Sequence, residues 1–427
     1  MFAMMKKICF LPDGCSAREP DIRRIMSSVE GSYEFTRDPT EADVILQNVC
    51  AFTISEPRIN RVTANLLYLR KVKKDGAIAI VYGCGAEAFK EEIFKAAGVD
   101  YVIKDKIVEQ VTKILGVKPS NKFYLKNSIE LVINLVPGCA KIEGYCYFCK
   151  QNYMKKKPYS AYRIEEVVEM VIEYGMPVLY LTGMNNCNYG LDYGDHKPKL
   201  HLLLRELEKI PSLKYIDIDG IAPSCVYPEL LEELQRNSKV FSIQFMIQSG
   251  SNSMLAQMNI GTTVEKLEVA LQHLKGKKVV TGVVVSHPGE TLEDVKQTID
   301  FLRKWNIWNC RVQPYTNSRR TPSYKMEQLP EDVYKQHYGM VKEAVENLAK
   351  TFLNEQVGKR IRGFVAEINP RYNEPIVCCA TEFEATFCIK EFSRPLRPGD
   401  YVEAVVTEVI RDSAQNALLI AEEIVDE

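Results

Sequence analysis

The feature that most constrains the fold is an alternation of short apolar runs with amphipathic stretches, which continues over about the first 350 residues. A strand, a turn and a helix repeated in this order predict parallel strands, because a crossover helix returns the chain to the same edge of the sheet. Helices then cover the sheet. We therefore expect an α/β protein in this part of the chain.

Up to about Leu115, four apolar runs follow this pattern, and the first three each end on a cysteine. These runs and cysteines are KICFLPDGC with Cys15, ADVILQNVC with Cys50, AIAIVYGC with Cys84, and VDYVI. Ligands gather at the carboxyl ends of parallel strands, so the three thiols are expected to converge although they lie far apart in sequence. A single cysteine is more often a small buried apolar residue, which is our interpretation of Cys9. Three cysteines at equivalent positions indicate a cluster site instead.

A second, longer series begins with IELVINLVPGC at residues 129–139. Further strands are expected at 178–181, 215–219, 242–247, 278–286 and 310–315, and helices near 163–174, 228–235, 264–274, 292–305 and 331–350. Six strands with crossover helices predict a partial (β/α)6 barrel of the TIM type, whose functional loops follow the carboxyl ends of the strands.

From residue 352 the pattern changes to short alternating runs broken by proline and glycine, which is typical of a small antiparallel β-barrel. Three domains are therefore predicted, at residues 1–118, 127–351 and 352–427.

The strongest local signal is GCAKIEGYCYFCK, which places Cys139, Cys146 and Cys149 directly after the first barrel strand. Three thiolates can hold three irons of a 4Fe–4S cluster and leave the fourth iron open to another ligand. Zinc is the alternative. A structural zinc site requires four ligands, and no fourth cysteine or histidine lies nearby in sequence.

Composition places the chain in the cytosol. The N-terminus lacks the apolar run of a signal peptide, and no stretch approaches the roughly 18 apolar residues that a membrane-spanning helix needs. A reducing cytosol does not favour stable disulfides, so the clustered members of the 13 cysteines are interpreted as metal ligands or reactive thiols. The net charge of -1 gives no general attraction to nucleic acid or to a membrane.

The triad at residues 139–149, with aromatic Phe148 before its last cysteine, resembles that of radical S-adenosylmethionine enzymes. The flanking segments are similar to the methylthiotransferase branch, which combines an N-terminal domain holding an auxiliary cluster, a radical domain and a C-terminal barrel called TRAM. Cys15, Cys50 and Cys84 match the auxiliary-cluster cysteines. LTGMNNCNYGLD, MIQSGSNSMLAQMN, SHPGET and YTNSRRTPSYKM match further family segments.

One departure from the family pattern concerns the spacing of the triad. The family usually has three residues between the first two cysteines, whereas six stand here, AKIEGY. Doubling the length of a closed loop costs only about 0.6 kcal/mol, so the cluster remains feasible. Gly144 is expected to supply the extra turn.

The resemblance implies two 4Fe–4S clusters and S-adenosylmethionine, which serves as both methyl donor and radical source. The implied activity is insertion of a methylthio group at an unactivated C–H bond. A flavodoxin or ferredoxin is the expected electron donor, and the expected state is a monomer. An ordinary turn or packing role is the alternative at each expected cofactor contact. These contacts are Phe148, Gly183, Gln248, Ser249, Pro288 and Gly289.

Charge bears on the acceptor, which in related enzymes is a tRNA adenosine or an aspartate of a ribosomal protein. From residue 352 onward, eight Lys and Arg stand against fourteen Asp and Glu, so 8 - 14 = -6. A surface that meets a phosphate backbone should be basic, whereas an acidic one favours a basic partner. We therefore expect a protein or peptide acceptor, with tRNA as the alternative.

Two other classes of function stay open. One is a radical enzyme that uses its second cluster for other chemistry. The other is a non-catalytic RNA-binding iron-sulfur protein.

Overall fold

The structure is a computed structural model of the whole chain. It describes residues 5–11, 16–50, 54–56, 59–126, 128–139, 141, 144–149, 159–319, 321–369, 374–378, 385–389, 393–413 and 417–424. The chain divides into two compact units, Met1–Leu125 (unit 1) and Lys126–Glu427 (unit 2). The three domain boundaries expected from the sequence stay predictions.

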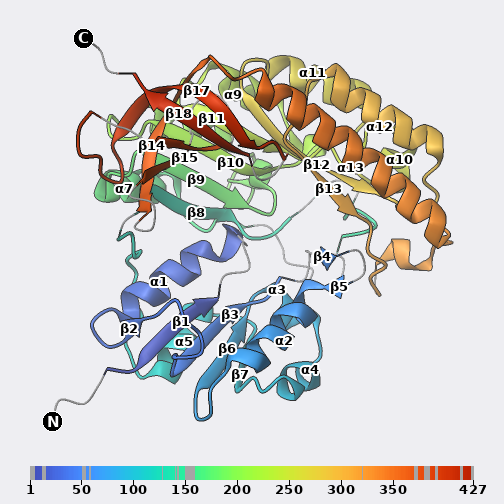
Figure 1. Cartoon of the computed structure of the whole chain (residues 1–427). Helices are drawn as coiled ribbons and strands as arrows, with labels where there is room; N and C mark the ends of the chain where they lie inside the picture. The colour runs from blue at the N-terminus through green and yellow to red at the C-terminus, as the bar shows by residue number, and fades with distance from the viewer. Residues whose placement is uncertain are drawn as a thin grey trace. The chain divides into compact units, whose positions relative to one another are not determined.

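Unit 1 is built on a five-stranded parallel sheet in the order β2-β1-β3-β6-β7, drawn in blue in Figure 1. Its strands are β1 (Lys7–Leu11), β2 (Glu34–Phe35), β3 (Val44–Asn48), β6 (Ile78–Tyr82) and β7 (Tyr101–Ile103). The four predicted strands are present. The two-residue edge strand β2 was not predicted. A short hairpin, β4 (Ile54–Glu56) and β5 (Ile59–Asn60), follows β3.

Helices cover both faces of this sheet, because successive strand residues point to opposite sides. Val44 and Leu46 pack in one core with helices α1 (Glu19–Val29) and α5 (Ile107–Leu115). Ile45 between them packs in a second core with α2 (Arg61–Val72), α3 (Cys84–Ala88) and α4 (Glu91–Ala96). A short 3-10 helix, η1 (Ser16–Arg18), precedes α1. The continuous apolar runs of the sequence thus reflect a sheet that is buried on both faces.

Unit 2 contains a six-stranded parallel sheet in which the strands lie side by side in chain order, from β8 at one edge to β13 at the other. The strands are β8 (Glu130–Val136), β9 (Val178–Gly183), β10 (Tyr215–Ile221), β11 (Val240–Phe245), β12 (Lys278–Val285) and β13 (Cys310–Pro314). Every strand pairs with its neighbours in sequence, as in a TIM-like barrel, and β8 and β13 are the two edges of the sheet. The predicted α/β class and partial barrel are confirmed.

Crossover helices connect these strands, and α12 packs beside α13 along the outside of the sheet (Figure 1). The helices are α7 (Ile164–Tyr174), α8 (Leu200–Glu208), α9 (Pro228–Arg236), α10 (Asn252–Gln257), α11 (Val264–His273), α12 (Leu292–Lys304) and α13 (Glu331–Asn354). Three 3-10 turns, η2 (Asn186–Asn188), η3 (Pro223–Cys225) and η4 (Pro322–Lys325), follow β9, β10 and β13. The sequence did not predict α8 and α10.

The C-terminal strands form a closed five-stranded barrel within unit 2, in the order β14-β15-β16-β18-β17. They are β14 (Arg360–Asn369), β15 (Glu374–Cys378), β16 (Thr386–Ile389), β17 (Tyr401–Arg411) and β18 (Leu418–Glu423). Buried residues alternate with exposed or half-buried ones over residues 401–406 of β17, as expected for a strand with one face on a core. The barrel is antiparallel as predicted, except that β16 and β18 pair in parallel.

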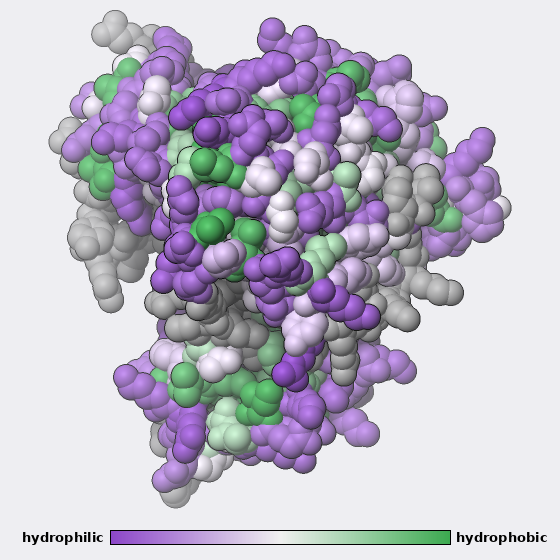
Figure 2. Space-filling model, turned by 90° about the vertical axis from the view of Figure 1, so that its right-hand side faces the viewer, coloured by the Kyte–Doolittle hydropathy of each residue, from purple (hydrophilic) through white to green (hydrophobic). Residues whose placement is uncertain are grey.

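No helix in the described parts of the chain is long and apolar enough to cross a membrane. Figure 2 shows one face of the molecule, on which hydrophilic side chains predominate and apolar ones are scattered among them. Scattered apolar residues are normal for a protein surface.

Candidate cluster and cofactor site

The residues with metal-binding side chains lie on two sheet edges. The unit 1 edge is formed by the carboxyl ends of β1, β3 and β6, and the unit 2 edge by those of β8 to β13. Cys50 follows β3 by two residues, and Cys84 is the first residue of the helix after β6. Backbone hydrogen bonds from Val49 N to Tyr82 O and from Gly85 N to Val49 O join these two chain segments. The structure therefore places Cys50 and Cys84 at one edge, whereas Cys15 lies outside the described residues.

A buried amide is the most informative feature of the unit 1 edge. Asn48, the last residue of β3, is 1% exposed, and neither its Nδ2 nor its Oδ1 has a hydrogen-bond partner within the described part of the chain. Gly83 lies against it: its φ of +103° suits only glycine, and a Cβ there would collide with Asn48 Oδ1 and Val49 O. The edge thus holds an unsatisfied polar group and a glycine cradle next to two thiols, which fits a bound iron-sulfur cluster.

At the unit 2 edge, the described residues of the loop 139–149 (the cysteine loop) carry Cys139, Cys146 and Cys149. A turn joins the last two cysteines, with Cys149 N donating to Cys146 O at 3.0 Å. Lys141, from the six-residue insert, donates from Nζ to Cys146 Sγ at 3.2 Å and to Asn259 O at 3.0 Å. Gly144 has φ +84°, as the expected extra turn requires. The insert therefore places a cation beside a thiol of the triad.

The loop after α10 holds the cysteine loop in place. Asn259 Nδ2 donates to Tyr145 O at 3.1 Å, and Tyr147 N donates to Met258 O at 2.9 Å. Asn259 itself has φ +55°, an uncommon conformation for a residue other than glycine. Together with Lys141, these contacts fix the insert on both of its sides.

Asn185, after β9, connects the triad to a further cysteine. Its Nδ2 donates to Cys225 Sγ at 3.2 Å and to Cys139 Sγ at 3.9 Å. Burial raises the pKa of the Cys139 thiol to about 12, and the neighbouring Cys146 and Cys225 add to the shift. Since a metal ligand must be deprotonated, cluster assembly has to displace a firmly held proton from Cys139.

The side chains that could act as ligands at this site are compatible with a cluster. Among the residues that the structure describes, no three Cys, His, Asp or Glu side chains could hold one metal ion. A 4Fe–4S cluster requires a different arrangement, because each thiolate binds its own iron. Three thiols on one loop, with an amide and an ammonium donating to two of the sulfurs, fit such a cluster.

The residues expected to contact the cofactor lie along the same edge. Gly183 ends β9, and a Cβ there would collide with the side-chain oxygen of Asn186. Gln248 and Ser286 both have positive φ, 68° and 63°, at the ends of β11 and β12. Strained residues of this kind persist where the surroundings hold them and cluster at functional sites. Gln248 is half-buried.

The remaining expected contacts have partners of their own. Ser249 is buried, and its hydroxyl lies 3.0 Å from that of Thr298 on α12. Pro288 is buried, whereas Gly289 is exposed with φ +81° and the side chain of Gln257 beside it. The roles of these residues toward a cofactor stay predictions.

Phe148 belongs to an aromatic row with His287 and Tyr315. Its ring centroid is 6.4 Å from that of His287, which is 5.0 Å from that of Tyr315. His287 is fully buried, bonded through Nε2 to Ser323 Oγ at 2.7 Å, and burial lowers its pKa to about 4. A neutral imidazole thus links the cysteine loop to the loop after β13.

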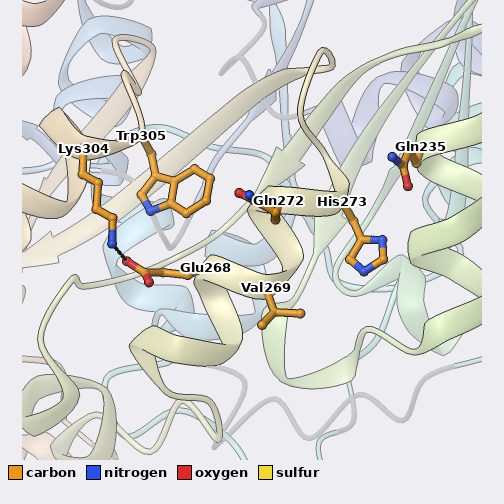
Figure 3. Close-up of a pocket in the computed structure, with 7 residues that line it drawn as sticks. All are labelled: Gln235, Glu268, Val269, Gln272, His273, Lys304 and Trp305. Atoms are coloured by element: carbon orange, nitrogen blue, oxygen red, sulfur yellow. Dashed lines mark hydrogen bonds and ion pairs between the residues drawn. The ribbon is translucent and has the colours of Figure 1, made fainter.

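A pocket of about 670 Å³ on the outer surface of unit 2 lies at the opposite end of the strands. It lies among α9, α11 and α12, and Figure 3 shows the residues that line it: Gln235, Glu268, Val269, Gln272, His273, Lys304 and Trp305. Gln235, His273 and Lys304 lie where these helices end and lead into the next strands. In barrels of this type the chemistry takes place at the carboxyl ends of the strands, so this pocket is not the site.

Sequence reasoning missed Lys141, Asn48, Asn185, Asn259 and Cys225. Asn48 and Asn185 lie within motifs that were recognised, at or just after the ends of predicted strands. Their polar side chains could therefore have been predicted to lie at the site. Cys225 follows a predicted strand by a few residues, which is the same signal that marked Cys50. Nothing in the sequence indicates that Lys141 contacts Cys146.

Two family models match the parts of the chain that contain the two edges. Residues 133–302 match the radical SAM superfamily, and residues 7–104 match uncharacterized protein family UPF0004. The chain is 27% identical to ribosomal protein uS12 methylthiotransferase RimO of Sulfurovum sp., over 95% of this chain and 96% of that protein. It is 26% identical to threonylcarbamoyladenosine tRNA methylthiotransferase MtaB of Aquifex aeolicus, over 85% and 93%.

Among solved structures, the chain resembles the radical S-adenosylmethionine methyltransferase TsrM from Kitasatospora setae. The TM-score is 0.51 at 13% sequence identity, covering 75% of this chain and 74% of that one. At this identity the likeness concerns the fold.

Proposed function

Because this chain belongs to the radical S-adenosylmethionine methylthiotransferase family, we propose that it inserts a methylthio group into a protein or peptide. It is an enzyme that uses S-adenosylmethionine and two 4Fe–4S clusters. We assign one cluster to Cys139, Cys146 and Cys149, and the auxiliary cluster to Cys15, Cys50 and Cys84.

When bound, these groups supply an electron that cleaves S-adenosylmethionine to a hydrogen-abstracting radical, and a sulfur that is methylated and transferred. The chain's own residues set the environment for that chemistry. Lys141 and Asn185 donate hydrogen bonds to the sulfurs of Cys146 and Cys139 in the first triad. Phe148 and neutral His287 provide apolar ring surface beside the cysteine loop, which limits water there.

The cofactor contacts in this proposal follow the strand ends. Gly183 leaves room for the side chain of Asn186 at the end of β9, and the strained backbone at Gln248 directs the chain at the end of β11. Phe148, Ser249, Pro288 and Gly289 complete the proposed set. For buried Ser249, the proposed role is to hold the loop through Thr298.

Charge on the C-terminal barrel is the observation that carries the choice of acceptor. Strands β17 and β18 carry four glutamates, Glu403, Glu408, Glu422 and Glu423, against one basic residue, Arg411. Tyr401 and Ile410 of β17 are 41% and 48% exposed. An acidic surface with exposed apolar side chains suits a basic polypeptide and repels a phosphate backbone.

Relatives of both kinds have similar identity to this chain. RimO of Sulfurovum sp. is named for ribosomal protein uS12, whereas the 24% identical protein of Aliarcobacter butzleri is a tRNA-2-methylthio-N(6)-dimethylallyladenosine synthase. The names of the relatives therefore do not choose between acceptors, and the proposal rests on the barrel.

The test uses anaerobically reconstituted enzyme with methyl-labelled S-adenosylmethionine and separated protein and tRNA extracts. We expect label in the protein fraction, together with S-adenosylhomocysteine and 5′-deoxyadenosine. Label in tRNA alone would overturn the choice of acceptor but not the chemistry. Deoxyadenosine without S-adenosylhomocysteine would indicate another radical reaction, and neither product a non-catalytic protein. Cys310→Ala, which removes a buried thiol at the start of β13, is the matched control for cysteine variants.

A further inference from the structure

The side chain of Asn48 has no hydrogen-bond partner among the residues that the structure describes. It is buried at the end of β3, and both of its polar atoms lack partners within the described part of the chain. An amide buried in this way is destabilising unless something else accepts its hydrogen bonds. Polar groups that stay unsatisfied in a native fold point to a bound group or ion.

The neighbouring amide shows that this edge is able to satisfy such groups. Gln47 is also buried, and its Nε2 donates to Leu11 O at 3.3 Å and to Asn48 O at 2.8 Å. The two side chains leave the strand on opposite faces, since they are adjacent in β3. Gln47 therefore joins β3 to the end of β1, whereas Asn48 makes no comparable hydrogen bond to any described residue.

The position of Asn48 indicates what its partner is. It stands two residues before Cys50, and its Oδ1 lies against Gly83, the residue before Cys84. The glycine brings the chain segment of Cys84 close to the amide, because any side chain at position 83 would clash with it. Asn48 thus lies next to the backbone segments that carry two proposed auxiliary ligands, where thiolate and sulfide sulfurs would be acceptors for amide N–H groups that have no partner among the described residues.

We propose that the side-chain amide of Asn48 donates a hydrogen bond to the auxiliary 4Fe–4S cluster and raises its reduction potential. Hydrogen bonds to cluster sulfurs are one of the factors that set such potentials. They stabilise the reduced, more negative state more than the oxidised one. Asn48 is a positioning and tuning residue, and the inference rests on the proposed assignment of Cys15, Cys50 and Cys84.

The test isolates one cluster. In full-length protein carrying Cys139→Ala, Cys146→Ala and Cys149→Ala, the remaining cluster is titrated with reductant and followed by electron paramagnetic resonance, with iron measured in parallel. We expect Asn48→Ala to shift the oxidised-to-reduced equilibrium at least tenfold, which is 59 mV toward lower potential for one electron. Asn48→Asp, which exchanges the donor amide for a carboxylate, should shift it further in the same direction.

Gln47→Leu is the matched control, because it removes an equally buried amide at the same edge whose donors are already used within the protein. It should leave the potential unchanged, whatever its effect on stability. Equal shifts in the Gln47 and Asn48 variants, or no shift in Asn48→Ala, would overturn the inference while leaving the cluster assignment intact.

Loss of iron from every Asn48 variant calls for a second measurement on the parent protein. With 15N-labelled asparagine, the reduced cluster should show a hyperfine coupling to an amide nitrogen, and absence of that coupling would overturn the inference. A parent protein that binds no iron through Cys15, Cys50 and Cys84 would overturn the two-cluster proposal itself.

Discussion

The two cysteine-bearing edges are built in opposite ways. At the unit 2 edge the triad lies on one loop, and protein groups already contact its thiols: Lys141 at 3.2 Å from Cys146 and Asn185 at 3.9 Å from Cys139. At the unit 1 edge the thiols come from separate strands, and the buried amide of Asn48 has no partner in the described chain. At the unit 2 edge, one loop and the side chains that contact it position the thiols. At the unit 1 edge, the order of the strands brings the thiols together, and a bound group is needed to satisfy the buried amide.

The largest expected effect separates the two edges by their chemistry. Cys146→Ala should abolish formation of both 5′-deoxyadenosine and methylthio product, because the radical source is lost. Cys50→Ala should abolish the methylthio product while deoxyadenosine still forms, because only the auxiliary ligand set is broken. Product analysis by mass spectrometry checks both, and Cys310→Ala should retain both products. Identical product losses in the two variants would contradict the division of labour.

The next prediction concerns acid stability, which the unit 2 edge should limit. Buried His287 has a folded pKa of about 4, against an ordinary value near 6.5, so the unfolded chain takes up a proton between these values and the folded chain does not. Its contribution to stability is therefore present above about pH 6.5 and is lost as the pH falls to 4, by about 3 kcal/mol.

Denaturant unfolding of the apoprotein across this pH range measures the effect. His287→Gln should flatten the pH dependence, and the exposed His196→Gln should leave it unchanged. An unaltered slope in His287→Gln would mean that other groups cause the acid sensitivity.

Glycine packing at the unit 2 edge gives an effect of similar or slightly smaller size. Gly220 has φ +68°, and a Cβ there would collide with the carbonyl oxygen of Gly183 on the neighbouring strand. We expect Gly220→Ala to lower the free energy of unfolding by about 2–3 kcal/mol, as strain and a backbone clash combine. Gly276→Ala, with φ +88° but open space around it, should cost about 1 kcal/mol. Equal losses would show that the clash is relieved by a small shift.

The smallest effect tests the six-residue insert. Lys141→Met keeps the aliphatic stem but removes the charge-assisted hydrogen bond to Cys146, which for a half-buried lysine is worth about 1 kcal/mol. The radical cluster should therefore become harder to reduce by roughly 40 mV, with no change in the auxiliary cluster. Potentiometric titration measures this, with exposed Lys275→Met as control. A shift in both clusters would show that Lys141 acts through general stability.

The fold followed from the sequence wherever one physical rule dominated. Apolar runs such as those of β3 and β12 are buried parallel strands, and their order along the chain predicted the order in the barrel. The two-residue strand β2 and the parallel pair β16–β18 were missed. Whether such segments form strands, and with which neighbour they pair, depends on tertiary contacts more than on local propensity.

The same distinction holds for the candidate site. Cys50 and Cys84 were placed at one edge by topology alone. The contacts of Lys141 with Cys146, and of Asn185 with Cys139 and Cys225, depend on how the loops after β8, β9 and β10 meet, which residue spacing does not encode. His287 illustrates the limit: nothing in its sequence neighbourhood, SHPGET, shows that its ring is fully buried and in contact with those of Phe148 and Tyr315.

Iron and sulfide content of the anaerobically reconstituted protein tests the central claim most directly. Two clusters predict about eight irons and eight sulfides per chain, falling to about four when either Cys139, Cys146 and Cys149 or Cys15, Cys50 and Cys84 are replaced by alanine, and to none when all six are replaced. About four irons in the parent protein, or complete loss on replacing a single triad, would contradict two independent clusters on two differently built edges.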